Sequence, residues 1–251
     1  MRPHPSAFLE SDTPVTDAPP PYDVVVFDCD STLSDLEGID HLATALGPDE
    51  AAAIAALTDE AMDGGKSLQE VYGLRLERIR PDRAALEALG TKYVAELLPS
   101  AREVVDALGF LGKEVHVVSG GLFPGVLRLG AELGLTPERI HAVGLALDEH
   151  GAYAGFDEAS PLAREGGKIE VVAALRAGRA TALVGDGATD LEAAPELARF
   201  VAFGGVKRRD AVFERARIQA TDRDLVQLLP LLCTGPELDR IDAEPRFAGL
   251  L

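Results

Sequence analysis

Short apolar, β-branched runs alternate with helical segments, and this alternation limits the fold more than any other feature. The strand-like runs cover residues 24–27, 114–119, 140–147, 180–184 and 200–203. Helical periodicity lies between and beyond them, at residues 101–111, 124–134, 167–177, 189–198 and 207–216. A hairpin is expected where turn-like residues 148–151 precede residues 152–156. The pattern predicts an α/β fold, with a parallel sheet flanked by helices on both faces.

One long helical stretch interrupts the alternation directly after the first strand. Residues 36–98 are rich in Ala, Leu and Glu, and apolar residues recur there at spacings of three and four. Glycine and proline residues divide the stretch into about three or four helices; the breaks fall at Gly47-Pro48, Gly64-Gly65 and Pro81. We predict that residues 36–98 form a helical cap domain, inserted into a core made of residues 22–35 and 99–230.

Both ends of the chain are expected to lie outside the core. Residues 1–21 contain six prolines, and this composition predicts a disordered tail. No apolar stretch precedes a cleavage site there, so export is not expected. Residues 231–251 show no clear period, and we predict a loose C-terminal tail.

Charge and cysteine content restrict the partners and the compartment. The chain has 24 Lys and Arg against 42 Asp and Glu, a net charge of −18. Because no basic run offsets this charge, neither nucleic acid nor an anionic membrane is an expected partner. No apolar run approaches the ~18 residues of a membrane span. Two cysteines, Cys29 and Cys233, are too few for a disulfide framework, which favours a reducing cytoplasm.

Polar residues follow three of the expected strands, where each strand ends. In open α/β sheets, ligands bind outside the carboxyl ends of the strands. Each set alone has an ordinary interpretation as a cap or a turn, but three sets in order, with a lysine between the second and third, indicate a site. The sets are Asp28-x-Asp30-x-Thr32, Ser119-Gly120-Gly121 and Gly185-Asp186-Gly187-Ala188-Thr189-Asp190.

The spacing of the carboxylates suits phosphoryl transfer. Side chains alternate along a strand, so Asp28 and Asp30 point the same way. One carboxylate can attack phosphorus while the other donates a proton to the departing oxygen. Asp186 and Asp190 add negative charge alongside. Four converging carboxylates would repel one another without a hard divalent cation, for which Mg²⁺ is the natural choice.

The remaining polar residues fit a phosphate group. Ser119 and the amides near Gly120 can bond a phosphate oxygen, and Lys168 would neutralise phosphate or orient Asp28. Alternatives stay open for each of them. Asp190 can be a helix N-terminal acid, the glycine pair a tight turn, and Lys168 an exposed surface residue.

Four segments resemble the motifs of the phosphoserine phosphatases of the haloacid dehalogenase superfamily, in that family's order. They are FDCDSTLSDLEGID (27–40), AMDGGKSLQEVYGLRLERI (61–79), YAGFDEASPLAREGGK (153–168) and GDGATDLEAAPELARFVAFGG (185–205). The resemblance covers about residues 22–230. It implies a Rossmann-like parallel sheet with a helical cap after the first strand. It also implies Mg²⁺-dependent hydrolysis of O-phospho-L-serine through an aspartyl phosphate, as in serine biosynthesis.

The resemblance also implies a role for each matching residue. Asp28 would be the nucleophile, Asp30 the general acid and then base, and Lys168 the group that stabilises the phosphoaspartate. The other implied roles are phosphate and substrate binding by Ser119, Gly120 and Thr189, with Thr32 nearby, and Mg²⁺ binding by Asp28, the Asp30 carbonyl and Asp186, with support from Asp190. In the cap, Glu37 would meet the substrate ammonium, Arg75 its carboxylate, and Met62 would line the pocket.

Asp30 discriminates among the chemistries of this superfamily. A halide leaves without a proton, whereas an alkoxide needs one, so an acid at position 30 favours phosphate ester hydrolysis. Ion-pumping ATPases would need membrane helices. A related phosphatase, or a phosphotransferase that passes phosphate to an alcohol such as homoserine, remains the alternative. Without the resemblance, Glu37 is equally an early helix acid and Arg75 a solvated surface residue.

Overall fold

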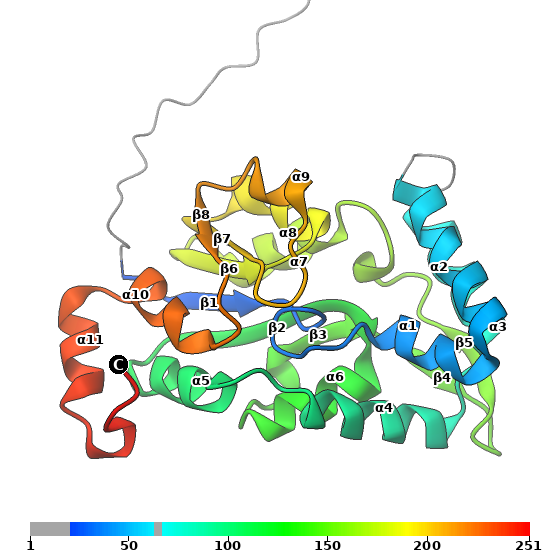
Figure 1. Ribbon diagram of the computed structural model, residues 1–251, viewed down its shortest axis with the longest axis horizontal. Helices are drawn as coiled ribbons and strands as arrows, with labels where there is room; N and C mark the ends of the chain where they lie inside the picture. Colours follow the sequence, from blue (N-terminus) through cyan, green and yellow to red (C-terminus); the bar gives the residue numbers. More distant parts are fainter. Residues whose placement is uncertain (1–20, 63–66) are drawn as a thin grey trace, which may run out of the picture.

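A six-stranded parallel sheet forms the centre of the computed structural model, which describes residues 21–62 and 67–251 (Figure 1). The strand order is β3-β2-β1-β6-β7-β8. The strands are β1 (Val24–Phe27), β2 (Glu114–Leu122), β3 (Ile140–Val143), β6 (Thr181–Gly185), β7 (Arg199–Phe203) and β8 (Ile218–Ala220). Strand β1 is central and fully buried, with Val25 opposite Val115 on one side and Ala182 on the other. Burial on both faces explains why β1 is a continuous apolar run.

Helices cover both faces of this sheet (Figure 1). One face carries α5 (Ala101–Phe110) and α6 (Phe123–Glu132), and the other carries α7 (Gly167–Arg176), α8 (Ala188–Glu192) and α9 (Asp210–Phe213). From β1 the chain first moves to β2 and β3 on one side, and later to β6, β7 and β8 on the other side. Because each crossover is right-handed, the helices of the two halves lie on opposite faces of the sheet. The predicted α/β architecture is confirmed. The carboxyl ends of β1, β2 and β6 meet where the strand order reverses, which is where such sheets bind ligands.

The predicted helical insertion follows β1. It consists of α1 (Gly38–Ala43), a 3-10 turn (Thr44–Leu46), α2 (Pro48–Met62), α3 (Leu68–Ile79) and α4 (Arg83–Ala95). Helix α4 packs along α6 of the core. A Cβ atom at Gly90 would lie 2.8 Å from the Cβ of Arg128, so glycine permits the close approach of the two helices. The last helix of the insertion therefore rests on the core, and the cap boundary at residues 36–98 stays a prediction.

The predicted single strand over residues 140–147 is wrong. The chain leaves the sheet at Gly144, so β3 ends at Val143 and residues 145–147 form β4 (Leu145–Leu147). Strand β4 pairs in antiparallel fashion with β5 (Tyr153–Phe156), which is the expected hairpin. The Phe156 ring packs against Tyr72 of α3, with ring centroids 5.2 Å apart. The hairpin thus supports the inserted helices rather than the sheet.

The predicted loose tail over residues 231–251 is also wrong. The chain there forms α11 (Gly235–Asp242) after α10 (Leu229–Leu232), followed by a 3-10 turn at Pro245–Phe247. Ile241 is fully buried, and the Phe247 ring packs edge-on against Phe110 with centroids 5.6 Å apart. The buried Nζ of Lys113 lies 2.6 Å from Oε1 of Glu237. These anchors are irregularly spaced in the sequence, so no periodicity could reveal them.

Two predicted helices are shorter in the structure. The helix expected over residues 207–216 is only one turn, α9, and strand β8 follows it without having been predicted. The helix expected over residues 189–198 ends at Glu192, before a 3-10 turn that contains Pro195. The tail predicted at residues 1–21 lies outside the described residues except for Pro21. Within the part of the chain that the structure describes, no helix is long and apolar enough to cross a membrane.

Candidate active site

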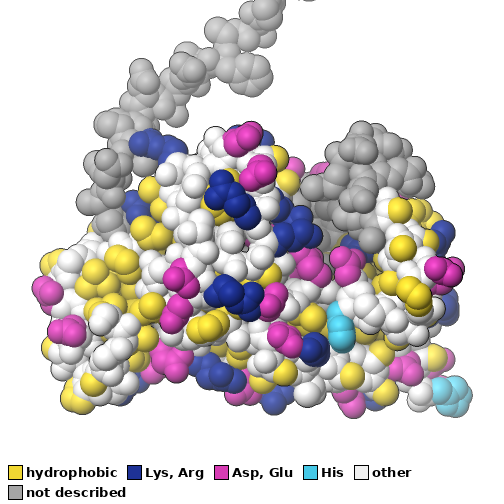
Figure 2. Space-filling view, viewed as in Figure 1, with side chains coloured by type: hydrophobic (Ala, Val, Ile, Leu, Met, Phe, Trp, Pro, Cys, Tyr) yellow, Lys and Arg dark blue, Asp and Glu magenta, His cyan; other side chains and the backbone are white. Residues whose placement is uncertain are grey.

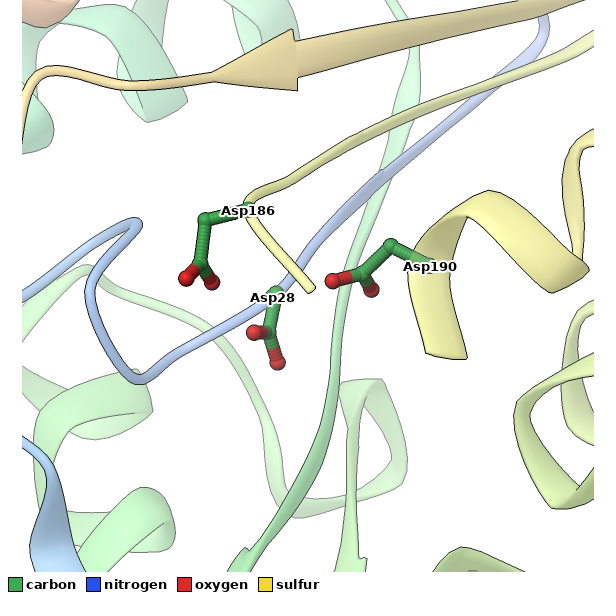
Figure 3. A group of neighbouring side chains, drawn as sticks. All are labelled: Asp28, Asp186 and Asp190. Carbon is green, nitrogen blue, oxygen red and sulfur yellow. The ribbon is translucent and has the colours of Figure 1, made fainter. Parts of the chain in front are cut away.

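Three buried carboxylates converge at the carboxyl edge of the sheet (Figure 3). Asp28 follows β1, Asp186 follows β6, and Asp190 lies in the first turn of α8. Each contributes an oxygen atom, and these atoms lie within 4.8 Å of one another. Their exposed fractions are 7%, 3% and 0%. A group made only of carboxylate oxygens suits a hard divalent cation.

Lys168 joins two of these carboxylates. Its Nζ lies 2.8 Å from Oδ1 of Asp28 and 2.5 Å from Oδ1 of Asp190. The other Asp190 oxygen accepts the N–H of Gly187 at 3.0 Å. A Cβ at Gly185 would lie 2.3 Å from Cγ of Asp190, so the end of β6 must be glycine for this carboxylate to reach inward. The position of Lys168 excludes its interpretation as an exposed lysine, and both oxygens of Asp190 are engaged with the protein.

Arg209 also enters the site, although the sequence did not single it out. Its Nε lies 2.8 Å from Oδ2 of Asp186, and its NH2 lies 3.2 Å from Oε1 of Glu37. The same Glu37 oxygen accepts the hydroxyl of Ser31 at 2.8 Å. Arg209 therefore bridges Asp186, a predicted metal ligand, and Glu37, the residue predicted to bind the substrate ammonium group. Arg209 is one of three consecutive basic residues and lies 172 positions from Glu37, so nothing in the sequence distinguishes it.

The local charges leave this cluster short of positive charge. Three carboxylates face two cations, Lys168 and Arg209. Burial raises the pKa of Asp186 to about 7, and the negative charges of Asp28 and Asp190 act in the same direction. Burial likewise raises the pKa of Asp190 to about 6, against the effect of Lys168. A divalent cation would relieve this repulsion, so the donor set fits the predicted metal.

The other predicted catalytic carboxylate, Asp30, is held on one side by two donors. Its Oδ1 accepts the N–H of Gly38 at 2.7 Å and the hydroxyl of Tyr93 at 2.6 Å. Its Oδ2 lies 3.3 Å from Oγ of Ser119. Tyr93 comes from α4, so the packing of that helix on the core places its hydroxyl in the site. Nothing in the sequence marks Tyr93, which looks like an ordinary buried residue of an amphipathic helix.

Asp30 is suited to carry a proton at neutral pH. Loss of solvent raises its pKa to about 7, and the negative charges of Asp28 and Glu37 act in the same direction. Two donors already occupy Oδ1, so Oδ2, which faces Ser119, is the oxygen that is free to take up a proton. A raised pKa suits Asp30 to the expected role of general acid and base.

Ser119 and the adjacent glycines pack closely beside Asp30. Ser119 is fully buried, and its Oγ accepts the N–H of Gly121 at 2.9 Å. A Cβ at Gly121 would lie 3.1 Å from both Oδ2 of Asp30 and Oγ of Ser119. The buried Oγ1 of Thr32 makes no hydrogen bond to the described residues. Strand β2 continues through this Ser-Gly-Gly sequence to Leu122, so the glycines are not the tight turn that was the alternative.

A cavity of about 200 Å³ lies between this edge of the sheet and the inserted helices. Several predicted site residues line it: Asp30, Glu37, Arg75, Gly120, Lys168 and Thr189. Tyr72 of α3 lines it too and donates its hydroxyl to the Gly120 carbonyl at 2.9 Å. Arg164, which was not predicted, belongs to the same wall as Leu162 and Lys168. Met62 ends α2, and its side chain lies outside the described part of the chain.

Arg75 lies in the cavity wall but already has a partner. Its NH2 donates to Oδ1 of Asp40 in α1. Its Nε is buried and has no hydrogen-bond partner among the described residues. Its side chain is 13% exposed, so Arg75 is not the solvated surface residue that was the alternative. A buried, unpaired donor in a cavity wall is available to an anionic ligand.

Known proteins share both the sequence and the fold. The profile of the haloacid dehalogenase-like hydrolases matches residues 25–195. The chain is 36% identical to a phosphoserine phosphatase of Bos taurus, over 84% of this chain and 93% of the relative. It is 36% identical to a chloroplastic phosphoserine phosphatase of Arabidopsis thaliana, over 77% and 67% of the two chains. A crystal structure of a phospho-aspartyl intermediate analogue of phosphoserine phosphatase superimposes with a TM-score of 0.70, at 26% identity, over 85% of this chain and all of the other.

The profile match covers the inserted helices and every carboxylate of the cluster. The profile match alone spans more than half of the chain and includes Asp28, Asp30, Asp186 and Asp190. The chain belongs to the haloacid dehalogenase-like hydrolases.

Proposed function

We propose that this chain is a phosphoserine phosphatase, which hydrolyses O-phospho-L-serine to L-serine and phosphate. The observation that carries the proposal is the cavity itself. Asp30 and Lys168 line it from the core, and Lys168 is bonded to Asp28, whereas Glu37 and Arg75 line it from the inserted segment. This arrangement offers a phosphoryl-transfer site and two opposite charges for an amino acid. Phosphoserine phosphatases of animals and plants, similar over most of the chain, support the same substrate.

The reaction passes through an aspartyl phosphate. The Asp28 carboxylate attacks phosphorus, and the bond from phosphorus to the serine oxygen breaks. Asp30 gives its Oδ2 proton to that oxygen, and serine leaves as an alcohol. Asp30, now a carboxylate, takes a proton from a water molecule that attacks the phosphoaspartate. This second step releases phosphate, restores Asp28 and returns the proton to Asp30.

Lys168, Ser119 and the Gly120 amide hold the phosphoryl group in this proposal. Lys168 also fixes the orientation of Asp28, since it bonds that carboxylate in the structure. Asp28, the Asp30 carbonyl and Asp186 would hold Mg²⁺. A bound Mg²⁺ would supply positive charge to the phosphoryl oxygens. Asp190 supports the ion indirectly, because both of its oxygens are bonded to Lys168 and Gly187.

The substrate's amino-acid end faces the inserted helices. Glu37 binds the ammonium group and Arg75 the carboxylate, with Thr189 in the same cavity wall. A contact of the substrate with Met62 is part of the proposal. Glu37 is bonded to Arg209 in this structure, so the ammonium group must share or displace that contact. Arg75 offers its unpaired Nε. We also propose a cytoplasmic location, which the two free, buried cysteines suit.

A phosphate-release panel tests the function. Purified protein is assayed with phosphoserine, phosphoethanolamine and p-nitrophenyl phosphate, with Mg²⁺ or with excess chelator. We expect the highest kcat/KM for phosphoserine and no turnover in chelator. Equal kcat/KM for all three esters would contradict the proposed substrate. Formation of phosphohomoserine when homoserine is added would instead identify a phosphotransferase.

A further inference from the structure

Arg164 lines the cavity from a loop of the core. It follows the 3-10 turn Pro161–Ala163, and its own backbone is fixed by hydrogen bonds to Pro161 and from Gly167. The loop packs against α3, where Nε2 of Gln69 donates to the Glu158 carbonyl at 3.2 Å. Helix α3 also carries Arg75. The fold thus places two arginines, Arg75 on α3 and Arg164 on a loop of the core, in the lining of the same small cavity.

Only part of the Arg164 guanidinium is engaged. Its NH2 donates to both oxygens of Glu170, at 2.7 and 2.8 Å. Its Nε and NH1 make no hydrogen bond within residues 21–62 and 67–251. The side chain is 39% exposed. Glu170 therefore holds the guanidinium in place by one nitrogen and leaves the others for a ligand.

The negative charge of the chain makes a second guanidinium group in this cavity notable. The chain carries a net charge of −18, although basic side chains lie among the acidic ones on the face shown in Figure 2. A substrate carboxylate has about four acceptor positions. Arg75 cannot fill all of them, because its NH2 is already bonded to Asp40. A carboxylate in this cavity therefore needs a further donor.

We propose that Arg164 is a second carboxylate-binding residue, which contacts the substrate's α-carboxylate from the core side while Arg75 contacts it from the inserted helices. This inference rests on the proposed function. It makes the site selective for phosphomonoesters that carry a second anionic group near the phosphate. It also assigns Glu170 as the residue that positions Arg164.

Alanine at position 164 tests the proposal. The assay compares kcat/KM for phosphoserine with kcat/KM for phosphoethanolamine, which has the same phosphate and ammonium groups but no carboxylate. We expect Arg164→Ala to lower the ratio of these two constants by roughly 10- to 100-fold, as for loss of a hydrogen bond to a charged group. The loss should fall mainly on KM, because the contact exists before and during the reaction. Arg164→Lys keeps the charge without the planar fork and should give an intermediate ratio.

Arg176→Ala is the matched control. Arg176 lies at the other end of α7, pairs with Glu196 and is 40% exposed, close to the value for Arg164. It does not line the cavity, so the ratio should stay at the wild-type value. A double-mutant cycle adds a second readout. If Arg75 and Arg164 bind one carboxylate, their effects on the ratio should not multiply.

The outcomes separate the inference from the function on which it rests. If the wild type shows no preference for phosphoserine over phosphoethanolamine, both are overturned. If the wild type shows the preference and Arg164→Ala keeps it, only the inference is overturned. Equal losses on the two substrates would also overturn it, because Arg164 would then act on the phosphate or on folding. The melting temperature of each variant shows whether Arg164→Ala impairs folding. If it does, the ratio of the two constants in Arg164→Lys decides whether Arg164 binds the carboxylate.

Discussion

Replacing Arg75 with alanine removes the one guanidinium that α3 directs into the cavity. The side chain is 13% exposed and its Nε is buried and unpaired, so a substrate carboxylate would meet it in a largely dehydrated place. Truncating one partner of such a pair typically costs about 2–5 kcal/mol. We therefore expect kcat/KM for phosphoserine to fall by roughly 10²-fold or more. The lost pair with Asp40, whose side chain is 47% exposed, should change the free energy of unfolding by less than about 1 kcal/mol.

The assay measures kcat/KM for phosphoserine and for p-nitrophenyl phosphate, which has no carboxylate. Arg75→Ala should lower the ratio of the two constants by the same factor. Arg78→Ala is the control, because Arg78 lies on the same helix and is 47% exposed, and its ion-pair partner among the described residues, Glu50, is 3.9 Å away. If both substrates lose activity equally in Arg75→Ala, then Arg75 acts on structure or on phosphoryl transfer. That result would refute its role in substrate recognition.

Three further predictions follow from particular contacts. Excess chelator should abolish phosphate release and Mg²⁺ should restore it; full turnover in chelator would contradict the metal site. Gly121→Ala places a methyl group 3.1 Å from Asp30 and Ser119. We expect kcat to fall at least about tenfold while the melting temperature changes little. Unchanged kcat would show that the reaction does not use the space that the methyl group fills. Burial and Arg139 lower the pKa of His116 from 6.5 to about 4. Between these pH values the unfolded chain therefore binds more protons than the folded protein. The free energy of unfolding should fall by up to about 3 kcal/mol as pH drops from 6.5 to 4. Denaturant titrations of His116→Gln at several pH values should lack that part of the pH dependence. If the free energies of unfolding of wild type and variant differ by the same amount at every pH, the titration of His116 does not cause the effect.

The strand ends were predictable because the pattern that marks them is local. A buried parallel strand is an apolar run, and the first polar residues after it must lie at the carboxyl edge. Asp28 and Asp186 follow from that rule alone, whereas Ser119 lies inside β2, which continues to Leu122. Lys168 was singled out only by its place between the second and third of the polar sets, since one lysine in a helix carries no signal of its own. The role of each of these residues in catalysis stays a prediction until it is measured.

Contacts between distant segments were not predictable. Tyr93 reaches Asp30 from 63 residues away only because glycines let α4 pack closely on α6. Arg209 lies in a basic stretch whose members look alike in sequence, and only the fold shows which one turns toward Asp186. The C-terminal helix is likewise anchored by single contacts, such as Glu237 with Lys113. Such contacts depend on tertiary packing, and the hydrophobic period of a segment does not record them.

Covalent labelling of the enzyme tests the central claim most directly. Protein mixed with phosphoserine labelled on phosphorus is quenched in acid during turnover, and the label retained on the protein is measured. We predict that the wild type retains label that hydroxylamine removes, as expected of an acyl phosphate, and that a folded Asp28→Asn protein retains none. Steady hydrolysis of phosphoserine by the wild type without any retained label, or label on Asp28→Asn, would contradict a phosphoaspartate at Asp28.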